Sequence, residues 1–441
     1  MNRLRAKCNR YVALFIAFLF AFPCTSVAGQ RNIPLVEDVI KGLTNLPTIE
    51  DLTGGKVKKG DVIDRDNVHL VRDFLSPAVY SCVLRGMVLR MGKQLPPHLM
   101  VNRYVREATK RNKGKAIMDA NGTVWYERPG IPWPGGIPFP EPRNGLQAAA
   151  NVKYGCVYDD LLNTIAMSLV NPEGKVYKTV NMEHRIMLYS TRTVVPPLGS
   201  IPGDENIMWK RISVITAPLE LKGLGQYTIR YYDDARYHDT GFVYLPAFKR
   251  TIRVSATTWQ DNVAGSDMTY GDGQGLSEPF SDWSFKLIDK RYLLLTEPES
   301  PIPFLDENVS INKRLRFDVG RKFPRNGWAI WPVHVVEGTP KKKHIYGKKI
   351  FYTHAWPYWN SVVPFAETDI YDRQLRLWKL YLSQTGNHYY VNRQPYATEW
   401  GTLMYDMQAD HMTQYWYTQQ LNKMNYRPAD LTLKTLLQIG R

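Results

Sequence analysis

Cysteine and histidine are scarce in this chain, whose 441 residues include 4 cysteines and 9 histidines. No two cysteines have the Cys-x-x-Cys spacing, so the sequence does not support thiol redox catalysis. The chain also lacks the Gly-x-Ser-x-Gly elbow, the His-Glu-x-x-His zinc motif, the Gly-x-x-x-x-Gly-Lys-Ser/Thr phosphate loop and the dinucleotide fingerprint. These absences argue against the enzyme classes that carry such motifs, and no cofactor or metal is predicted.

Apolar and aromatic residues are plentiful by contrast, at 44% and 12% of the chain. This is ample for the core of one large or two ordinary domains. Aromatic side chains within alternating runs favour a protein dominated by β-sheet. The formal net charge of +16 first suggests an anionic partner, either nucleic acid or anionic lipid.

Residues 1–28 have the pattern of a secretory signal peptide. Basic residues precede an apolar run over Tyr11–Phe22, and Ser26-Val27-Ala28 supplies small residues before a cut after Ala28. The apolar run is short for a membrane span, and the residues before Cys24 form a poor lipoprotein-processing box. We therefore expect a cleaved, soluble protein of the periplasm, with an outer-membrane association left open. No nucleic acid is expected there, whereas anionic lipid headgroups stay available as partners.

Cleavage after Ala28 would leave two cysteines, Cys82 and Cys156. An oxidising compartment permits a disulfide between them. Buried free cysteines are also common in proteins. The sequence leaves both possibilities open.

Residues 29–174 are expected to form a helical N-terminal region. The apolar spacing predicts one helix over His69–Met91 and another over His98–Lys110. The Pro-rich segment 129–142 can be neither helix nor strand, and its aromatic residues would dock it on the protein.

A further helix is expected after the Pro-rich segment. Asn144 or Asn151 would cap its N-terminus, and the helix would extend towards Leu169.

Residues 175–441 are expected to form a curved sheet domain with a short C-terminal helix. The predicted strands are Val176–Thr179, Arg185–Thr193, Trp209–Thr216, Gly225–Tyr232, Trp283–Thr296, Leu315–Val319, Trp328–Glu337, Lys348–His354, Thr368–Ser383 and a strand from Glu399. Short turns join these runs, which favours an antiparallel meander. The predicted fold class is β-dominated α+β, with one large antiparallel sheet curved into an open, incomplete barrel and helices packed against it.

The stretch 239–276 carries the densest local signal. Strand formers over Phe242–Leu245 stop at Pro246, and an alternating run resumes over Lys249–Thr257, which predicts a hairpin. The Gly- and Asp-rich residues from Asp261 to Gly275 cannot continue a strand and are expected to form an ordered loop.

This stretch resembles the signature of an uncharacterised Gram-negative periplasmic family in the outer-membrane lipoprotein-sorting, LolA/LolB-like group. The matched residues are Tyr244, Leu245, Pro246, Lys249, Arg250, Arg253, Gly265, Ser266 and Asp267. The segments Gly-Gly-Ile-Pro-Phe-Pro at 135–140 and 427–441 at the C-terminus are also similar to that family. The resemblance implies an open barrel whose apolar concavity takes up acyl chains. It also implies outer-membrane-directed transport beside an inner-membrane exporter of the RND type and outer-membrane components.

The candidate ligand-binding residues follow from this fold. Aromatic and aliphatic strand residues would line the cavity, namely Trp283, Phe285, Leu287, Trp328, Ile330, Trp331, Leu375, Leu377 and Trp378. An ordinary filled core fits the same residues. Lys249, Arg250 and Arg253 would contact an anionic headgroup or a partner protein, although they equally fit the solvated face of an amphipathic strand. The leading hypothesis is a non-enzymatic carrier of lipid or another hydrophobic molecule.

Two alternatives remain. Asp406, Asp410 and His411, with His388 upstream, would form the site of a metal-dependent or hydrolytic periplasmic enzyme if they converged. Polar residues hydrogen-bonded at a strand end would explain the same pattern. A structural adaptor that binds an envelope complex through its basic face is the third possibility.

Overall fold

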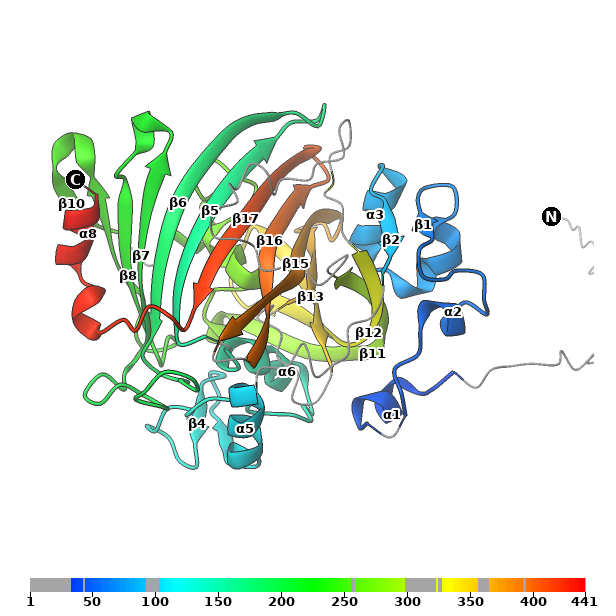
Figure 1. Ribbon diagram of the computed structural model, residues 1–441, viewed down its shortest axis with the longest axis horizontal. Helices are drawn as coiled ribbons and strands as arrows, with labels where there is room; N and C mark the ends of the chain where they lie inside the picture. Colours follow the sequence, from blue (N-terminus) through cyan, green and yellow to red (C-terminus); the bar gives the residue numbers. More distant parts are fainter. Residues whose placement is uncertain are drawn as a thin grey trace, which may run out of the picture. The chain divides into compact units, whose positions relative to one another are not determined.

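The computed structural model describes residues 33–42, 44–92, 103–156, 158–254, 258–297, 323, 327–355, 365–391 and 394–440. These residues belong to one compact unit, Ile33–Arg441. The unit is built on a 15-stranded sheet, in which the strands follow the order β1-β2-β12-β13-β14-β15-β16-β17-β5-β6-β7-β8-β9-β10 and β11 pairs with β12. Figure 1 shows these strands fanning across one strongly curved surface.

The strands of this sheet are β1 (Val62–Ile63), β2 (Leu89–Met91), β5 (Asp160–Val170), β6 (Val176–Leu188), β7 (Ile207–Ala217), β8 (Gly225–Tyr231), β9 (Thr240–Leu245), β10 (Arg250–Val254), β11 (Trp283–Glu297), β12 (Gly327–Pro340), β13 (Tyr346–His354), β14 (Glu367–Asp372), β15 (Leu377–Val391), β16 (Gln394–Asp406) and β17 (His411–Leu421). A separate hairpin joins β3 (Ala116–Met118) to β4 (Val124–Tyr126). All pairs in the large sheet are antiparallel except β2 with β12.

The α-helices are short: α1 (Val36–Ile40), α2 (Ile49–Leu52), α3 (Pro77–Leu84), α5 (Arg103–Asn112), α6 (Gly145–Tyr154) and α8 (Leu433–Ile439). The 3-10 helices are η1 (Val68–Phe74), η2 (Leu219–Leu221), η3 (Pro246–Phe248), η4 (Thr258–Gln260), η5 (Tyr270–Gly275), η6 (Phe280–Asp282) and η7 (Pro428–Asp430). The predicted fold class is confirmed, because the described strands form one large antiparallel sheet that is not closed into a barrel and carries few helices.

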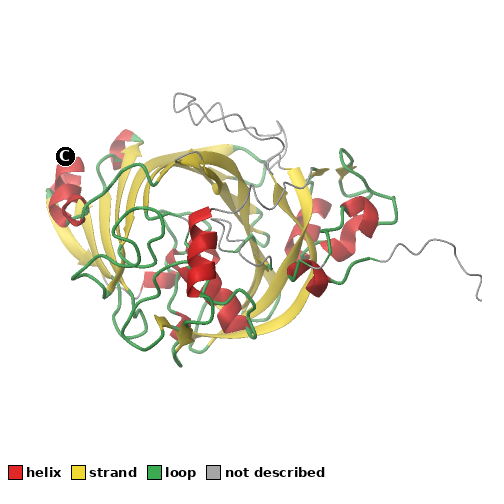
Figure 2. Ribbon diagram, turned by 60° about the horizontal axis from the view of Figure 1, so that its bottom comes forward, coloured by secondary structure: helices red, strands yellow, loops and turns green. Residues whose placement is uncertain are grey.

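The two faces of the sheet have different coverings. The outer face of β7, β8 and β9 is covered by α8, whose Leu436 packs against Ile212, Tyr227 and Tyr244. On the inner face, loop residues fill the curve of the sheet, as Figure 2 shows. Residues 258–278, called the inner loop below, are the part of this filling that carries Met268 into an apolar cluster with strand residues.

The predicted helix over His69–Met91 is wrong in extent. The structure divides it into η1, α3 and β2. Pro77 cannot lie inside a helix, so it begins a new one, and the Ser76 hydroxyl caps that helix by accepting a hydrogen bond from the Val79 N–H. The second predicted helix corresponds to α5, and its first residues, 98–102, lie outside the described residues.

The helix expected to reach Leu169 is also wrong beyond Tyr154, where α6 ends. Asn144 caps α6, whereas the Asn151 side chain bonds the backbone of Phe139 in the Pro-rich segment. Residues Asp160–Val170 form β5, a central strand of the sheet. The sheet therefore takes in β1, β2 and β5, which all precede residue 175.

Several other predictions have definite outcomes. The hairpin of β9 and β10 is confirmed, with η3 as its turn. Val176–Thr179 and the first part of Arg185–Thr193 form the single strand β6, while Thr368–Ser383 is split into β14 and β15 by a turn. The predicted strand Leu315–Val319 lies outside the described residues. Cys82 is buried in α3, and no disulfide joins it to Cys156.

The Pro-rich segment is docked as expected. Trp133 is fully buried, and its indole N–H donates to the Gly136 carbonyl at 2.7 Å. The segment also bonds α5, because the Ile137 N–H donates to the Thr109 hydroxyl at 2.8 Å. It thus forms part of the core instead of a free linker.

Two buried carboxyl groups on β14 give the fold a pH dependence. Burial raises the pKa of Asp369 to about 7, although hydrogen bonds from Tyr352, Ser76 and the Ala78 backbone act against it. Burial and the charge of Asp369 also raise the pKa of Glu367 well above its usual range. Between pH 5 and 7 the folded state therefore binds more protons at Asp369 than the unfolded state does.

Because of this difference, the free energy of unfolding should fall by roughly 2 kcal/mol as the pH rises from 5 to 7. Asp369→Asn is expected to reduce this slope, as measured by urea unfolding at several pH values, and the slope that remains belongs to Glu367, whose pKa is raised chiefly by burial. Asp372→Asn is the matched control on the same strand, because hydrogen bonds from Arg376, Gln408 and Gln374 outweigh burial and lower the pKa of Asp372. A slope as steep in Asp369→Asn as in the wild type would contradict the prediction.

Candidate functional site

The inner loop is fixed to the sheet by three acidic side chains. The first, Asp272, is fully buried and forms an ion pair with Lys349 of β13, with 2.7 Å between the carboxylate oxygen and Nζ. Its other oxygen accepts hydrogen bonds from Tyr346 and from the backbone and hydroxyl of Thr269. Burial alone would raise the pKa of Asp272, but the charges of Lys349 and Lys379 outweigh it and lower that pKa.

The second acidic side chain, Glu278, ends the loop. It accepts hydrogen bonds from the Trp283 indole N–H and faces the His344 ring nitrogen, both at 3.1 Å. The Trp283 ring is thereby held against the end of the inner loop. Trp283, which was predicted to line the ligand cavity, thus contacts another part of this chain.

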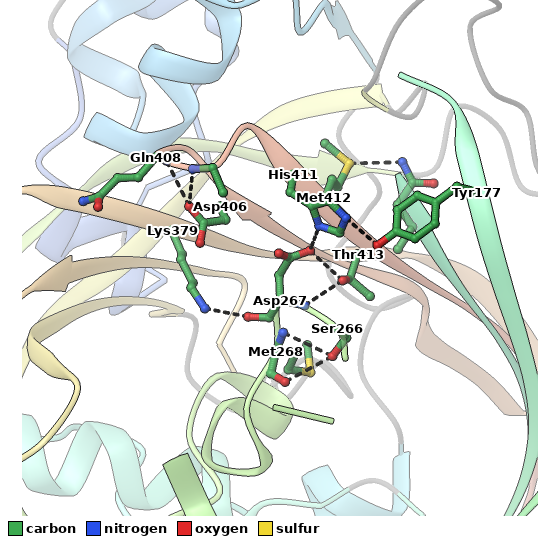
Figure 3. A network of polar contacts seen from close by, with 12 residues as sticks. Tyr177, Ser266, Asp267, Met268, Lys379, Asp406, Gln408, His411, Met412 and Thr413 are labelled. Atoms are coloured by element: carbon green, nitrogen blue, oxygen red, sulfur yellow. Dashed lines mark hydrogen bonds and ion pairs between the residues drawn. The ribbon is translucent and has the colours of Figure 1, made fainter. Parts of the chain in front are cut away.

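The third acidic side chain, Asp267, binds β17, as Figure 3 shows. One of its carboxylate oxygens lies 2.7 Å from His411 Nδ1 and 2.7 Å from the Thr413 hydroxyl. The other His411 ring nitrogen lies 2.8 Å from the hydroxyl of Tyr177 on β6. Lys379 of β15 donates to the Asp267 backbone carbonyl at 2.7 Å, so β15 and β17 both hold this short stretch.

The predicted enzyme residues do not converge. Asp406 accepts hydrogen bonds from the Trp378 indole and from the backbone of the turn that follows, while Asp410 bonds the Tyr405 hydroxyl. His411 faces Asp267 instead of either aspartate. The side chain of His388 lies outside the described residues. Among the described residues, no group of three or more His, Cys, Asp and Glu side chains is placed to hold a metal.

The structure divides the predicted cavity residues among separate clusters. Trp283, Phe285 and Leu287 lie in the cluster with α6, whereas Trp328, Ile330 and Leu377 lie in the cluster with α3. Trp331 belongs to a third cluster and Trp378 to the inner-loop cluster. Leu375 is 59% exposed in the turn between β14 and β15. Trp283, Trp328 and Ile330 are almost fully buried against this chain's own residues.

The predicted basic residues lie at one edge of the sheet. Lys249 ends η3, and Arg250 and Arg253 are exposed on β10, the terminal strand in the sheet order. Charged side chains on an edge strand oppose edge-to-edge association. Their proposed contact with a headgroup or a partner stays a prediction.

Sequence reasoning missed a polar group on the inner face of β5–β8. Tyr415 of β17 bonds the inner loop and therefore lies on the inner face. It pairs across the sheet with Met167 of β5, which pairs in turn with Val180 of β6, so these residues lie on the same face. By alternation, His184 and Ile186 share that face, and Ile186 pairs directly with Arg211 of β7. Arg211 in turn pairs with Thr228 of β8.

Arg211 and Arg230 on this face share one nearby acidic partner. Asp239 forms a bidentate ion pair with Arg230, whose guanidinium also lies 5.0 Å from the rings of Trp209 and Trp259. Arg211 has no ion pair or hydrogen-bond partner among the described residues, and its Nε is buried. Burial and the charge of Arg230 lower its pKa, although a guanidinium remains charged at any physiological pH.

The other polar groups around Arg211 are uncharged at pH 7. Burial and the charge of Arg211 lower the pKa of His184 to about 3, so this imidazole is neutral at pH 7. The Thr228 hydroxyl and the Asn163 side-chain carbonyl are buried without a hydrogen-bond partner. The inner face therefore carries one uncompensated positive charge among unsatisfied polar groups.

The helices in the described part of the chain are all too short or too polar to span a bilayer.

Solved structures and one family model are similar to this chain. The chain is similar to a Vibrio parahaemolyticus domain described as an outer-membrane lipoprotein-sorting protein domain, with 17% identity and a TM-score of 0.44 over 66% of this chain and 98% of that chain. It is also similar to a LolA superfamily protein from Nitrosomonas europaea, with 11% identity and a TM-score of 0.37 over 67% and 100% of the two chains.

A Desulfovibrio piger protein of the DUF1329 family gives 14% identity and a TM-score of 0.45 over 66% of this chain and 96% of that chain. A search of curated proteins finds no match. The family model described as "Protein of unknown function (DUF1329)" matches residues 62–435. The expected membership of an uncharacterised family is thus confirmed, and this chain belongs to the DUF1329 family.

Proposed function

We propose that this chain is a periplasmic, non-enzymatic binding protein for a lipid or another hydrophobic molecule. In this proposal it serves transport directed to the outer membrane, with an inner-membrane exporter of the RND type and outer-membrane components as partners. The ligand lies between the inner face of β5–β8 and the inner loop. Lys249, Arg250 and Arg253 at the open edge contact the headgroup side of a membrane or a partner protein.

One observation carries the proposal: the inner face is filled unevenly. On β13–β16 its apolar side chains, such as Ile370, Tyr381 and Met404, are fully buried by the chain itself. On the β17–β7 side, Tyr415, Met167 and Val180 of the same face are buried as well. Four other apolar side chains of that face are only half-buried, namely Tyr417, Ile186, Trp209 and Ile215. Each methylene that leaves water contributes about 0.8 kcal/mol, so covering this surface with an acyl chain is favourable.

Phe285 and Leu287 are half-buried in the cluster with α6 and stay candidate ligand contacts there. The polar contacts of Asp406, Asp410 and His411 are all internal, so no catalytic step is assigned to them.

Extraction of the purified protein with organic solvent, followed by lipid mass spectrometry, tests the proposal. We expect about one hydrophobic molecule per chain in the wild type. Ile215→Asp places a charge on the half-buried inner surface and should reduce the yield at least about tenfold, since an unpaired carboxylate is costly beside an acyl chain.

Thr216→Asp is the matched control, because this neighbouring residue is exposed. It should retain the wild-type yield, and circular dichroism should show both variants folded. A wild-type protein that carries no hydrophobe and takes none up from added lipid would refute the carrier function.

A further inference from the structure

We propose that Arg211 is the binding site for the anionic group of the ligand, a carboxylate or a phosphate, with Thr228 and His184 as additional donors. This inference rests on the proposed carrier function and assigns its ligand class: an amphipathic molecule with an acidic headgroup.

The first argument is the arrangement of donors. Arg211, Thr228 and His184 lie on three adjacent strands and on one face, with Arg211 and Thr228 as direct cross-strand partners. Thr228 is only 5% exposed, and its buried hydroxyl has no hydrogen-bond partner among the described residues. A carboxylate or phosphate beside Arg211 would accept from both, because its oxygens have several lone pairs.

The second argument is the charge. Asp239 neutralises Arg230, and the other nearby carboxylate, Asp234, forms its own ion pair with Lys153 at 2.7 Å. Two acidic groups therefore face three cations, and the excess charge resides on Arg211. The Arg211 side chain is half-buried and its Nε is buried without a partner. A cation partly removed from water without a counterion is costly, which favours an anion from outside the chain.

The third argument is the apolar surface on both sides. The guanidinium of Arg211 lies 5.3 Å from the Trp209 ring, and Ile186 is its direct cross-strand partner on β6. Ile215 continues the same face along β7. A headgroup at Arg211 would thus have half-buried apolar residues beside it for its chain to contact, which favours an amphipathic ligand over a free anion.

Displacement of the neutral dye Nile red from the purified protein tests the site. Hexadecanoic acid, hexadecyl phosphate and hexadecanol share one chain and differ in headgroup. We expect the two acids to displace the dye at concentrations at least about tenfold lower than the alcohol. In Arg211→Met this preference should fall to about one, with the affinity for the alcohol unchanged within about threefold.

Two further variants test whether the preference for acids depends on the positive charge at position 211. Arg211→Lys keeps the charge and should retain part of the preference. Arg185→Met is the matched control, because Arg185 lies on the outer face of β6, paired with Glu183, and should leave the preference intact. An acid preference that is absent in the wild type, or that survives Arg211→Met, would overturn the assignment.

Inorganic phosphate distinguishes a free anion from the acidic headgroup of an amphipathic molecule as the ligand of Arg211. Thermal stabilisation by phosphate in the wild type but not in Arg211→Met would support the anion site with a free anion as its ligand. Failure of the carrier function looks different, since neither the acids nor the alcohol would then displace the dye from any variant.

Discussion

Replacing Lys349 by methionine is expected to lower the free energy of unfolding by about 3–5 kcal/mol, because the Asp272 carboxylate would stay buried without its cation. Both side chains of the pair are fully buried, and Lys349 also donates to the Gly275 carbonyl at 3.0 Å. Methionine matches the length of the lysine stem, so packing against the Trp283 and Tyr346 rings changes little. Urea unfolding followed by tryptophan fluorescence measures the effect.

Lys348→Met is the matched control. Lys348 pairs with Glu337 at 2.9 Å, but about 30% of each side chain is exposed, and such a pair contributes at most about 1 kcal/mol. The double variant Lys349→Met with Asp272→Asn should recover at least half of the loss, because it leaves no unpaired buried charge. A Lys349→Met loss no larger than that of Lys348→Met would show that the pair does not hold the inner loop.

Gly136→Ala is expected to destabilise the fold by at least about 3 kcal/mol. Gly136 has a φ of +83°, and a Cβ there would lie 2.8 Å from the carbonyl carbon of Ala108 and in contact with the Thr109 backbone nitrogen. The left-handed conformation costs an alanine about 1–2 kcal/mol, and the clash with the α5 backbone adds the rest. Thermal and urea unfolding give the magnitude.

Gly130→Ala separates the two contributions. Gly130 lies in the same Pro-rich segment with a φ of +90°, but nothing lies within 4 Å of its Cβ position. This variant should therefore show only the conformational cost. Equal losses for the two variants would mean that α5 moves away easily and that the segment is not firmly packed.

The parts of the fold that were predicted correctly depend on local signals. The hairpin of β9 and β10 follows from Pro246 and from alternation on both sides of it. The strand β5 was missed because Leu161, Ile165, Met167 and Leu169 alternate with residues that are also largely buried. A run that is apolar on both faces has the same appearance as a buried helix.

The turn between β14 and β15 was missed for a related reason. It contains no glycine or proline, and Leu375 adopts a φ of +60° there. Leucine rarely adopts that conformation, so the sequence contains no turn signal at this point.

The candidate site was predicted only in part because its contacts join distant residues. His411 was identified as a polar residue of interest, but its partner Asp267 lies 144 positions away in the sequence. Arg211 was passed over because an arginine in an alternating strand normally faces water. The inner face of β7 is covered by the inner loop, which is distant in the sequence. The alternation within β7 therefore does not indicate that this face is covered.

The strand order also has a kinetic consequence. The middle of the sheet joins β5 to β17, and a hydrogen bond from the Asp159 N–H to the Asn422 side chain links residues 263 positions apart. Most other pairings join strands that follow one another in the sequence. The β17–β5 pairing forms late by comparison, because a long loop must close before its contacts form. Most of this chain must therefore be synthesised before the sheet can be completed.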